Sequence, residues 1–148
     1  MGVLVYSVVR RHMKRTSPGA FTVCGDVREM PVHVALRPSE TVVGWYRNPA
    51  PWQQCLVIFT SESLYIVDDE KIYRIVVSDI LGYEDPKSKK DVTGVRILTK
   101  DGFRFARVAG SFGPSGNQKD AYSFIMVLRA LVQGDPVVTF DHGSPDRT

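Results

Sequence analysis

The sequence has little of what marks disulfide-stapled, metal-binding or catalytic proteins. Its 148 residues include two cysteines and three histidines. Cys24 and Cys55 form no CxxC pair, so neither a disulfide framework nor a zinc site is predicted. His12, His33 and His142 are scattered, no GxSxG or HExxH motif occurs, and no His, Cys and carboxylate grouping has ligand spacing. We therefore expect no enzyme, no cofactor and no metal.

A long apolar run is also absent. Residues 3–9 are mostly apolar, but a membrane-spanning helix needs about 20 such residues. Arg10 and Arg11 follow this run, whereas a secretory signal places its positive charges before the apolar stretch. The sequence predicts a cytoplasmic protein, with peripheral attachment to a membrane as an alternative.

Acidic residues are missing from the first 25 positions, while Arg10, Arg11, Lys14 and Arg15 add four positive charges there. Without residues 1–15, the 19 basic residues fall to 15 against 16 acidic ones, which leaves a net charge of −1. A nearly neutral body argues against a large nucleic-acid surface, so no nucleic-acid partner is predicted.

Short alternating or apolar runs, separated by turn residues every eight to twelve positions, predict an antiparallel β-protein. An apolar fraction of 43% is ordinary for one soluble domain. We expect Phe103 and Phe105 to face inward, and Arg107, which is in phase with them, to require a bulge near Ala106 or a place at the barrel mouth. The seven predicted strands span residues 41–47, 55–60, 63–67, 71–77, 80–84, 94–99 and 103–108.

One amphipathic helix follows, with Ser115 as its N-cap, Gln118 completing a capping box, and a stop at Gly134 and Pro136. Its apolar face should close the β-framework; it comprises Ala121, Phe124, Ile125, Leu128, Leu131 and Val132.

The ends of the chain are less regular. Residues 1–35 form an N-terminal arm: residues 1–15 fit either a helix or a strand, and weak strands are predicted at 21–24 and 32–36. Residues 36–134 form the main domain. Residues 135–148 form a tail, whose end is predicted to be disordered.

The run from Phe59 to Ile66, the step Ser78-Asp79-Ile80 and the entry Pro38-Ser39-Glu40 resemble the bacterial pleckstrin-homology-like and GRAM domains. The resemblance covers roughly residues 36–133. It implies a mainly β fold: a barrel of two orthogonal antiparallel sheets with about seven strands, capped by a C-terminal α-helix. It also implies a non-enzymatic module that binds lipids, peptides or proteins, and the fold alone does not choose among these.

The lipid pocket implied by the resemblance is weakly matched, because the loop after the first strand is poor in basic residues and the turn Asp68-Asp69-Glu70 is acidic. Contacts to an anionic surface would come from other residues. The candidates are Arg10, Arg11, Lys14, Arg15, Trp52, Lys87, Lys89 and Lys90. For the N-terminal group, the alternative is an arm that packs on the barrel and leaves its charges in water; for Trp52, it is packing under its own loop.

A protein or peptide partner is the leading hypothesis. A ligand strand could add to the edge at residues 80–84, beside a flank of the helix; the candidate surface is Ile80, Gly82, Glu84, Tyr122 and Met126. The alternatives are a homo-oligomer through that edge, or permanent occupation of the edge by the N-terminal strands or by residues 137–140. A third hypothesis is a small enzyme with a phosphate-binding loop at residues 110–116, although the GK[ST] ending of a Walker loop is absent.

Overall fold

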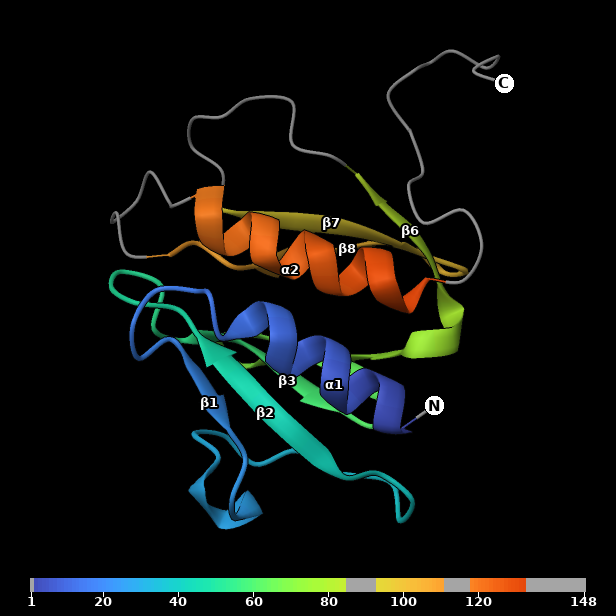
Figure 1. Cartoon of the computed structure of the whole chain (residues 1–148), viewed down its shortest axis with the longest axis horizontal. Coiled ribbons are helices and arrows are strands. Elements are labelled where there is room, and N and C mark those ends of the chain that lie inside the picture. The colour runs from blue at the N-terminus through green and yellow to red at the C-terminus, as the bar shows by residue number, and fades with distance from the viewer. Residues whose placement is uncertain (1, 85–92, 111–117, 133–148) are drawn as a thin grey trace.

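Two β-sheets covered on one side by two helices make up the described part of the chain, which comprises residues 2–84, 93–110 and 118–132 of a computed structural model (Figure 1). The helices are α1 (Gly2–Met13) and α2 (Gln118–Leu131), and the short 3-10 helices are η1 (Val27–Glu29) and η2 (Val77–Asp79). The strands are β1 (Phe21–Val23), β2 (Val42–Arg47), β3 (Cys55–Thr60), β4 (Ser63–Asp68), β5 (Lys71–Val76), β6 (Ile80–Glu84), β7 (Gly94–Thr99) and β8 (Gly102–Arg107).

The strands form two antiparallel sheets. The first has the order β1-β2-β3-β4-β5, and the second has the order β6-β7-β8. Helix η2 turns the chain from the last strand of one sheet into the first strand of the other. The prediction of two antiparallel sheets followed by a C-terminal helix is confirmed, and the seven predicted strands correspond to β2 through β8. Within the described residues no backbone ladder joins the sheets, so they do not form a closed barrel.

Helices α1 and α2 lie side by side in front of the sheets (Figure 1). We call this pair the helix layer. The predicted stripe of α2 is confirmed: Ala121, Phe124, Ile125, Leu128 and Leu131 are buried in the main core, and Val132 is partly buried against it. Burial of such a stripe supplies most of the stability of a surface helix.

For the N-terminal segment the helical alternative is confirmed over Gly2–Met13. Val5, Val8, Val9 and Met13 repeat at helical spacing and are buried in the same core as α2. Their burial overrides the strand preference of valine, which is modest and depends on context. The first helix therefore belongs to the core.

Of the two weak strands, the one at 21–24 is confirmed as β1, and the one at 32–36 is wrong. Val32, Val34 and Leu36 instead pack their side chains on a second apolar cluster, around Trp45 and Ile58. The alternating apolar residues that predicted a strand thus cover a sheet face without joining a ladder.

Two buried polar side chains connect the two sheets by hydrogen bonds at one corner. Asn48 donates to the carbonyls of Cys55 and Arg107, both at 2.8 Å, and accepts from the amide of Ala109 at 2.7 Å. It therefore links β2 and β3 to the end of β8. The Tyr46 hydroxyl accepts from the Gly110 amide at 3.0 Å. Such satisfied buried groups fix the relative position of the two sheets.

Asp120, which is fully buried, completes this corner from α2. Its carboxylate accepts from the Tyr46 hydroxyl at 2.7 Å and from the Ser17 amide at 2.9 and 3.1 Å. Burial, and then the neighbouring Asp120 carboxylate, raise the pKa of Tyr46 well above its ordinary value, so this hydroxyl stays protonated. One carboxylate thus joins the end of α1, strand β2 and the first turn of α2.

Candidate functional site

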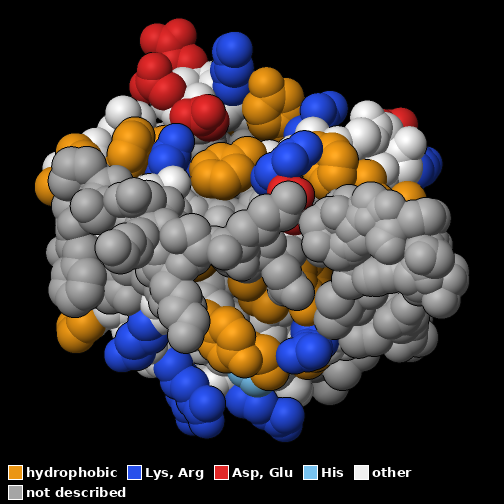
Figure 2. Space-filling model, turned by 90° about the horizontal axis from the view of Figure 1, so that it is seen from above, with side chains coloured by type: hydrophobic (Ala, Val, Ile, Leu, Met, Phe, Trp, Pro, Cys, Tyr) orange, Lys and Arg blue, Asp and Glu red, His pale blue; other side chains and the backbone are white. Residues whose placement is uncertain are grey.

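The outer face of the β6-β7-β8 sheet carries aromatic rings with arginine side chains stacked on them. The Arg96 guanidinium carbon lies 4.0 Å from the centroid of the Phe103 ring. That of Arg107 lies 3.9 Å from the Trp52 ring and 5.2 Å from the Phe105 ring. In the upper part of Figure 2, apolar side chains lie among basic and acidic ones. We call Trp52, Arg96, Phe103, Phe105 and Arg107 the arginine–aromatic face.

The direction of these side chains corrects the expectation for β8. Phe103 and Phe105 are 37% and 44% exposed and face outward, whereas Ala106 is fully buried. Arg107 is in phase with the two phenylalanines, as expected, but all three lie on the outer face. No bulge is required, because the register from Gly94 opposite Arg107 to Thr99 opposite Gly102 is unbroken.

Gly94 explains how Phe105 lies flat on the sheet. A Cβ atom at Gly94 would come within 2.5 Å of the Phe105 ring and 2.2 Å of the Ala106 carbonyl oxygen. Glycine therefore provides the space for the ring beside the β7 backbone, a role that glycine often has within strands. The aromatic ring in turn covers backbone that would otherwise be exposed.

Trp52 lies on the loop between β2 and β3, which leads it toward β8. It is partly buried, and its ring stacks on Arg107 from the other sheet. Neither of the two alternatives for this residue describes that contact. Its indole nitrogen has no hydrogen-bond partner among the described residues.

The predicted partner surface divides into buried and accessible positions. Ile80 and Gly82 are buried, and Glu84 is half-buried with an ion pair to Arg96 at 2.9 Å. On α2, Tyr122 is 55% exposed and Met126 is half-buried. Within the described residues β6 pairs with β7 alone, so its other backbone edge has no described partner strand. Strand addition at this edge stays a prediction.

Of the predicted anionic-surface residues, Arg10, Arg11, Lys14 and Arg15 are exposed at the end of α1. The apolar face of this helix is packed and its charges point to solvent, as the structural alternative predicted. Lys87, Lys89 and Lys90 lie outside the described residues, as do Ser115, most of the loop at 110–116 and the segment at 137–140.

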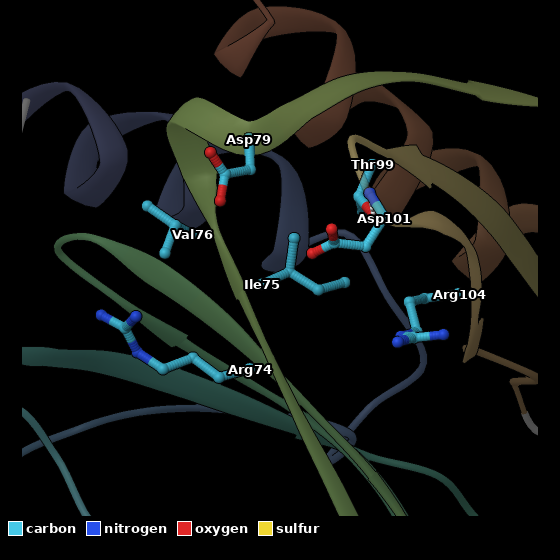
Figure 3. A pocket seen from close by; sticks show the side chains of 7 residues that line it. All are labelled: Arg74, Ile75, Val76, Asp79, Thr99, Asp101 and Arg104. Carbon is cyan, nitrogen blue, oxygen red and sulfur yellow. Dashed lines mark hydrogen bonds between the residues drawn. The ribbon is translucent and has the colours of Figure 1, made fainter.

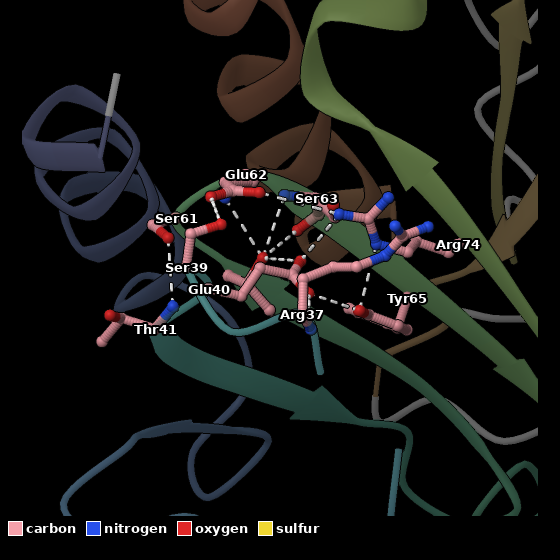
Figure 4. Close-up of polar contacts among 10 residues, drawn as sticks. Arg37, Ser39, Glu40, Thr41, Ser61, Glu62, Ser63, Tyr65 and Arg74 are labelled. Atoms are coloured by element: carbon pink, nitrogen blue, oxygen red, sulfur yellow. Dashed lines mark hydrogen bonds and ion pairs between the residues drawn. The ribbon is translucent and has the colours of Figure 1, made fainter. Parts of the chain in front are cut away.

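A network around Glu40 holds the start of β2 against β3 and β4 (Figure 4). The Glu40 carboxylate accepts from the Tyr65 hydroxyl at 2.6 Å, the Thr60 hydroxyl at 2.7 Å and the Arg37 amide at 2.9 Å. The Arg74 guanidinium lies 3.4 Å away. Burial raises the pKa of Glu40, but these hydrogen bonds lower it more, to about 2. Glu40 is therefore ionised, and its role is structural.

A small polar pocket lies where η2 faces the β7–β8 hairpin (Figure 3). Its volume is about 70 Å³, far below the roughly 300 Å³ at which small-molecule sites begin. Arg74, Asp79, Asp101 and Arg104 line it, and Asp79 also pairs with Lys100 at 3.5 Å. Opposite charges line the same pocket, so it favours neither an anion nor a cation.

In the described residues, no three His, Cys, Asp or Glu side chains lie close enough together to hold a metal ion. Among the described helices, none has the length and apolar character needed to cross a membrane. No protein-family model, curated protein or solved structure matches the chain. The resemblance to pleckstrin-homology-like domains therefore stays a prediction.

Proposed function

We propose that this chain is a non-enzymatic binding module, whose arginine–aromatic face recognises an acidic segment of a partner protein. The observation that carries the proposal is the stacking of Arg96 and Arg107 on aromatic rings, of which Phe103 and Phe105 are exposed and Trp52 is partly buried. Tryptophan and arginine are enriched at the energetic centres of protein interfaces, and aromatic residues in general are enriched in interfaces. Exposed apolar side chains that gather in one patch are a further mark of interaction surfaces.

The arginines of this face are held in place before any partner arrives. Each stacked guanidinium contributes about 0.5–1 kcal/mol at an exposed site, which restricts a side chain that is otherwise flexible. Arg107 also donates to the Thr93 hydroxyl at 2.9 Å. A side chain already ordered loses less conformational entropy on binding, so this arrangement favours affinity.

The charges of the face favour a carboxylate partner. Among described residues, Arg96 donates to Glu84 and Arg107 to Thr93, and an arginine has five N–H donors. Donors that remain can take a carboxylate in the two-pronged geometry that guanidinium groups provide. Glu84 offsets one of the two charges, so the face lacks the dense positive charge that a nucleic-acid backbone requires.

A random peptide library selected on the full chain tests this proposal. We expect the recovered peptides to be rich in Asp and Glu, with apolar residues between them. Arg107→Gln should weaken binding of a selected peptide about 30-fold, the effect of a hot spot near 2 kcal/mol. Tyr122→Ala, which removes an exposed aromatic ring from the helix layer, is the matched control and should change affinity less than about twofold. Selected peptides without acidic residues, or equal effects of the two variants, would contradict the proposal.

A further inference from the structure

The helix layer, together with the turn that follows α1, carries nearly all of the excess positive charge of the chain. Residues 2–17 and 118–132 contain six basic residues and one acidic residue, whereas the rest of the sequence contains 13 basic and 15 acidic residues. The single acid is Asp120, which is fully buried and accepts hydrogen bonds from Ser17 and Tyr46. The solvent side of the two helices therefore carries no exposed acidic side chain among the described residues.

The basic residues of this layer are exposed, and four of the six gather at one end of it. Arg10, Arg11, Lys14 and Arg15 lie at the end of α1, next to the first turn of α2, because the Ser17 amide binds Asp120. At the lower edge of Figure 2, on the side where Figure 1 shows the helices, basic side chains gather and no acidic one is visible. Within the described residues, Arg11, Lys14 and Arg15 form no ion pair.

His12 reports the same local charge. Its pKa is lowered by partial burial and then by the positive charges of Arg11 and Arg15. The positive charges of Arg11 and Arg15 also attract anions to this part of the surface.

Two exposed tyrosines accompany these charges. Tyr6 is 42% exposed and accepts a hydrogen bond from Arg10 at 2.9 Å, and Tyr122 is 55% exposed on the neighbouring helix. Tyrosine is favoured at membrane–water interfaces, because its ring can enter the headgroup region while its hydroxyl stays hydrated. Basic side chains can extend their aliphatic stems there and keep their charges at the phosphates.

We propose that the helix layer docks on the surface of an anionic lipid bilayer, through Arg10, Arg11, Lys14 and Arg15, with Tyr6 and Tyr122 at the headgroups. This function is additional to the protein-binding face on the β6-β7-β8 sheet. The layer is one side of a folded domain, so docking needs no unfolding of either helix. A bilayer surface extends over both helices, whereas a single extended polyanion follows a narrow track.

Co-sedimentation of the full chain with vesicles tests the proposal. The probes are phosphatidylcholine vesicles with and without phosphatidylserine at about one lipid in three, near −30 mV of surface potential. The variant Arg11→Gln, Lys14→Gln and Arg15→Gln should lower the partition coefficient about 100-fold, since each basic residue contributes about 1 kcal/mol. The matched control removes three exposed charges that lie outside the helix layer, by Arg28→Gln, Arg37→Gln and Lys71→Gln. It should lower the coefficient less than about threefold, because none of these residues belongs to the docked face.

A second variant separates a bilayer from a soluble polyanion. Tyr6→Ser with Tyr122→Ser should weaken vesicle binding several-fold and leave the weak binding of heparin unchanged, because only the bilayer offers the rings an interface. Circular dichroism would confirm that each variant is folded. The proposal is overturned if wild-type binding does not depend on phosphatidylserine, or if the two triple variants lose vesicle binding equally. It is also overturned if the tyrosine variant changes the binding of vesicles and of heparin to the same extent. Tighter binding to single-stranded nucleic acid than to vesicles would also overturn it.

Discussion

Replacing Glu40 by glutamine removes a buried charge while keeping the size of the side chain. Three donors converge on the carboxylate, from Arg37, Thr60 and Tyr65, and Arg74 lies 3.4 Å away. A neutral amide leaves these donors less well satisfied, and its own N–H group faces other donors. The removal of one partner from a buried polar network is among the costly kinds of substitution.

The magnitude follows from the lowered pKa of Glu40. The folded value is about 2 against an ordinary value of 4.5, and each pKa unit corresponds to about 1.4 kcal/mol. The ionised carboxylate therefore stabilises the fold by up to about 3 kcal/mol. Because the folded pKa is depressed, this contribution is complete above pH 4.5 and is lost as the pH falls toward 2.

Urea unfolding followed by tryptophan fluorescence would measure both effects, since Trp45 is buried. At pH 7 we expect Glu40→Gln to lower the free energy of unfolding by about 2–3 kcal/mol. Between pH 5 and pH 2 the wild type should lose that advantage, so the two curves should converge. Glu62→Gln is the matched control: this carboxylate is partly exposed and 3.8 Å from Arg74, so its removal should cost less than about 1 kcal/mol. If the free energies of unfolding of Glu40→Gln and wild type changed in parallel with pH, the stabilising role of the ionised Glu40 carboxylate would be contradicted.

Two further predictions concern the buried corner around Asp120 and the β6-β7-β8 sheet. Asp120→Asn should lower the free energy of unfolding by about 2–3 kcal/mol, because the Ser17 and Tyr46 donors lose their carboxylate. Hydrogen exchange of the α1 amides should also accelerate, and unchanged exchange in α1 would contradict this prediction. Gly94→Ala should cost about 1–3 kcal/mol in thermal unfolding, since its Cβ would lie 2.2 Å from a backbone oxygen. Gly25→Ala, where nothing lies within 4 Å, should be nearly neutral, and equal losses at both glycines would refute the packing argument.

The elements with a strong local pattern were predictable from the sequence. Phe124 and Leu128 repeat at helical spacing, and both are buried as expected. The turns between strands were equally clear: Asp69, for example, adopts a positive φ of 59° between β4 and β5. In these segments local preference and tertiary packing favour the same structure.

The arginine–aromatic face was missed because the apolar character of β8 was given too much weight. Their apolar character predicts that Phe103 and Phe105 face the interior, and Arg107 in the same phase then requires a bulge near Ala106 or a place at the barrel mouth. The small residue Ala106 gives the simpler solution, since it occupies the inner position and places all three larger side chains outside. Guanidinium stacking between strands then covers the exposed rings, and strand periodicity alone does not reveal such contacts.

The N-terminal helix shows a different limit. Valine-rich residues 3–9 fit a strand as well as a helix by propensity, and the choice depends on a core built by segments more than 100 residues later. The contact between Ser17 and Asp120 is one such long-range interaction. No local signal in the first 15 residues encodes that partner.

Amide chemical-shift mapping of the full chain with a library-selected acidic peptide would show most directly whether the arginine–aromatic face binds the peptide. We expect perturbations in β7 and β8 and at the Trp52 indole N–H, with little change in β6 or α2. Perturbations confined to Ile80–Glu84 and the neighbouring flank of α2 would place the peptide at the sheet edge, and would contradict the arginine–aromatic face as the binding site.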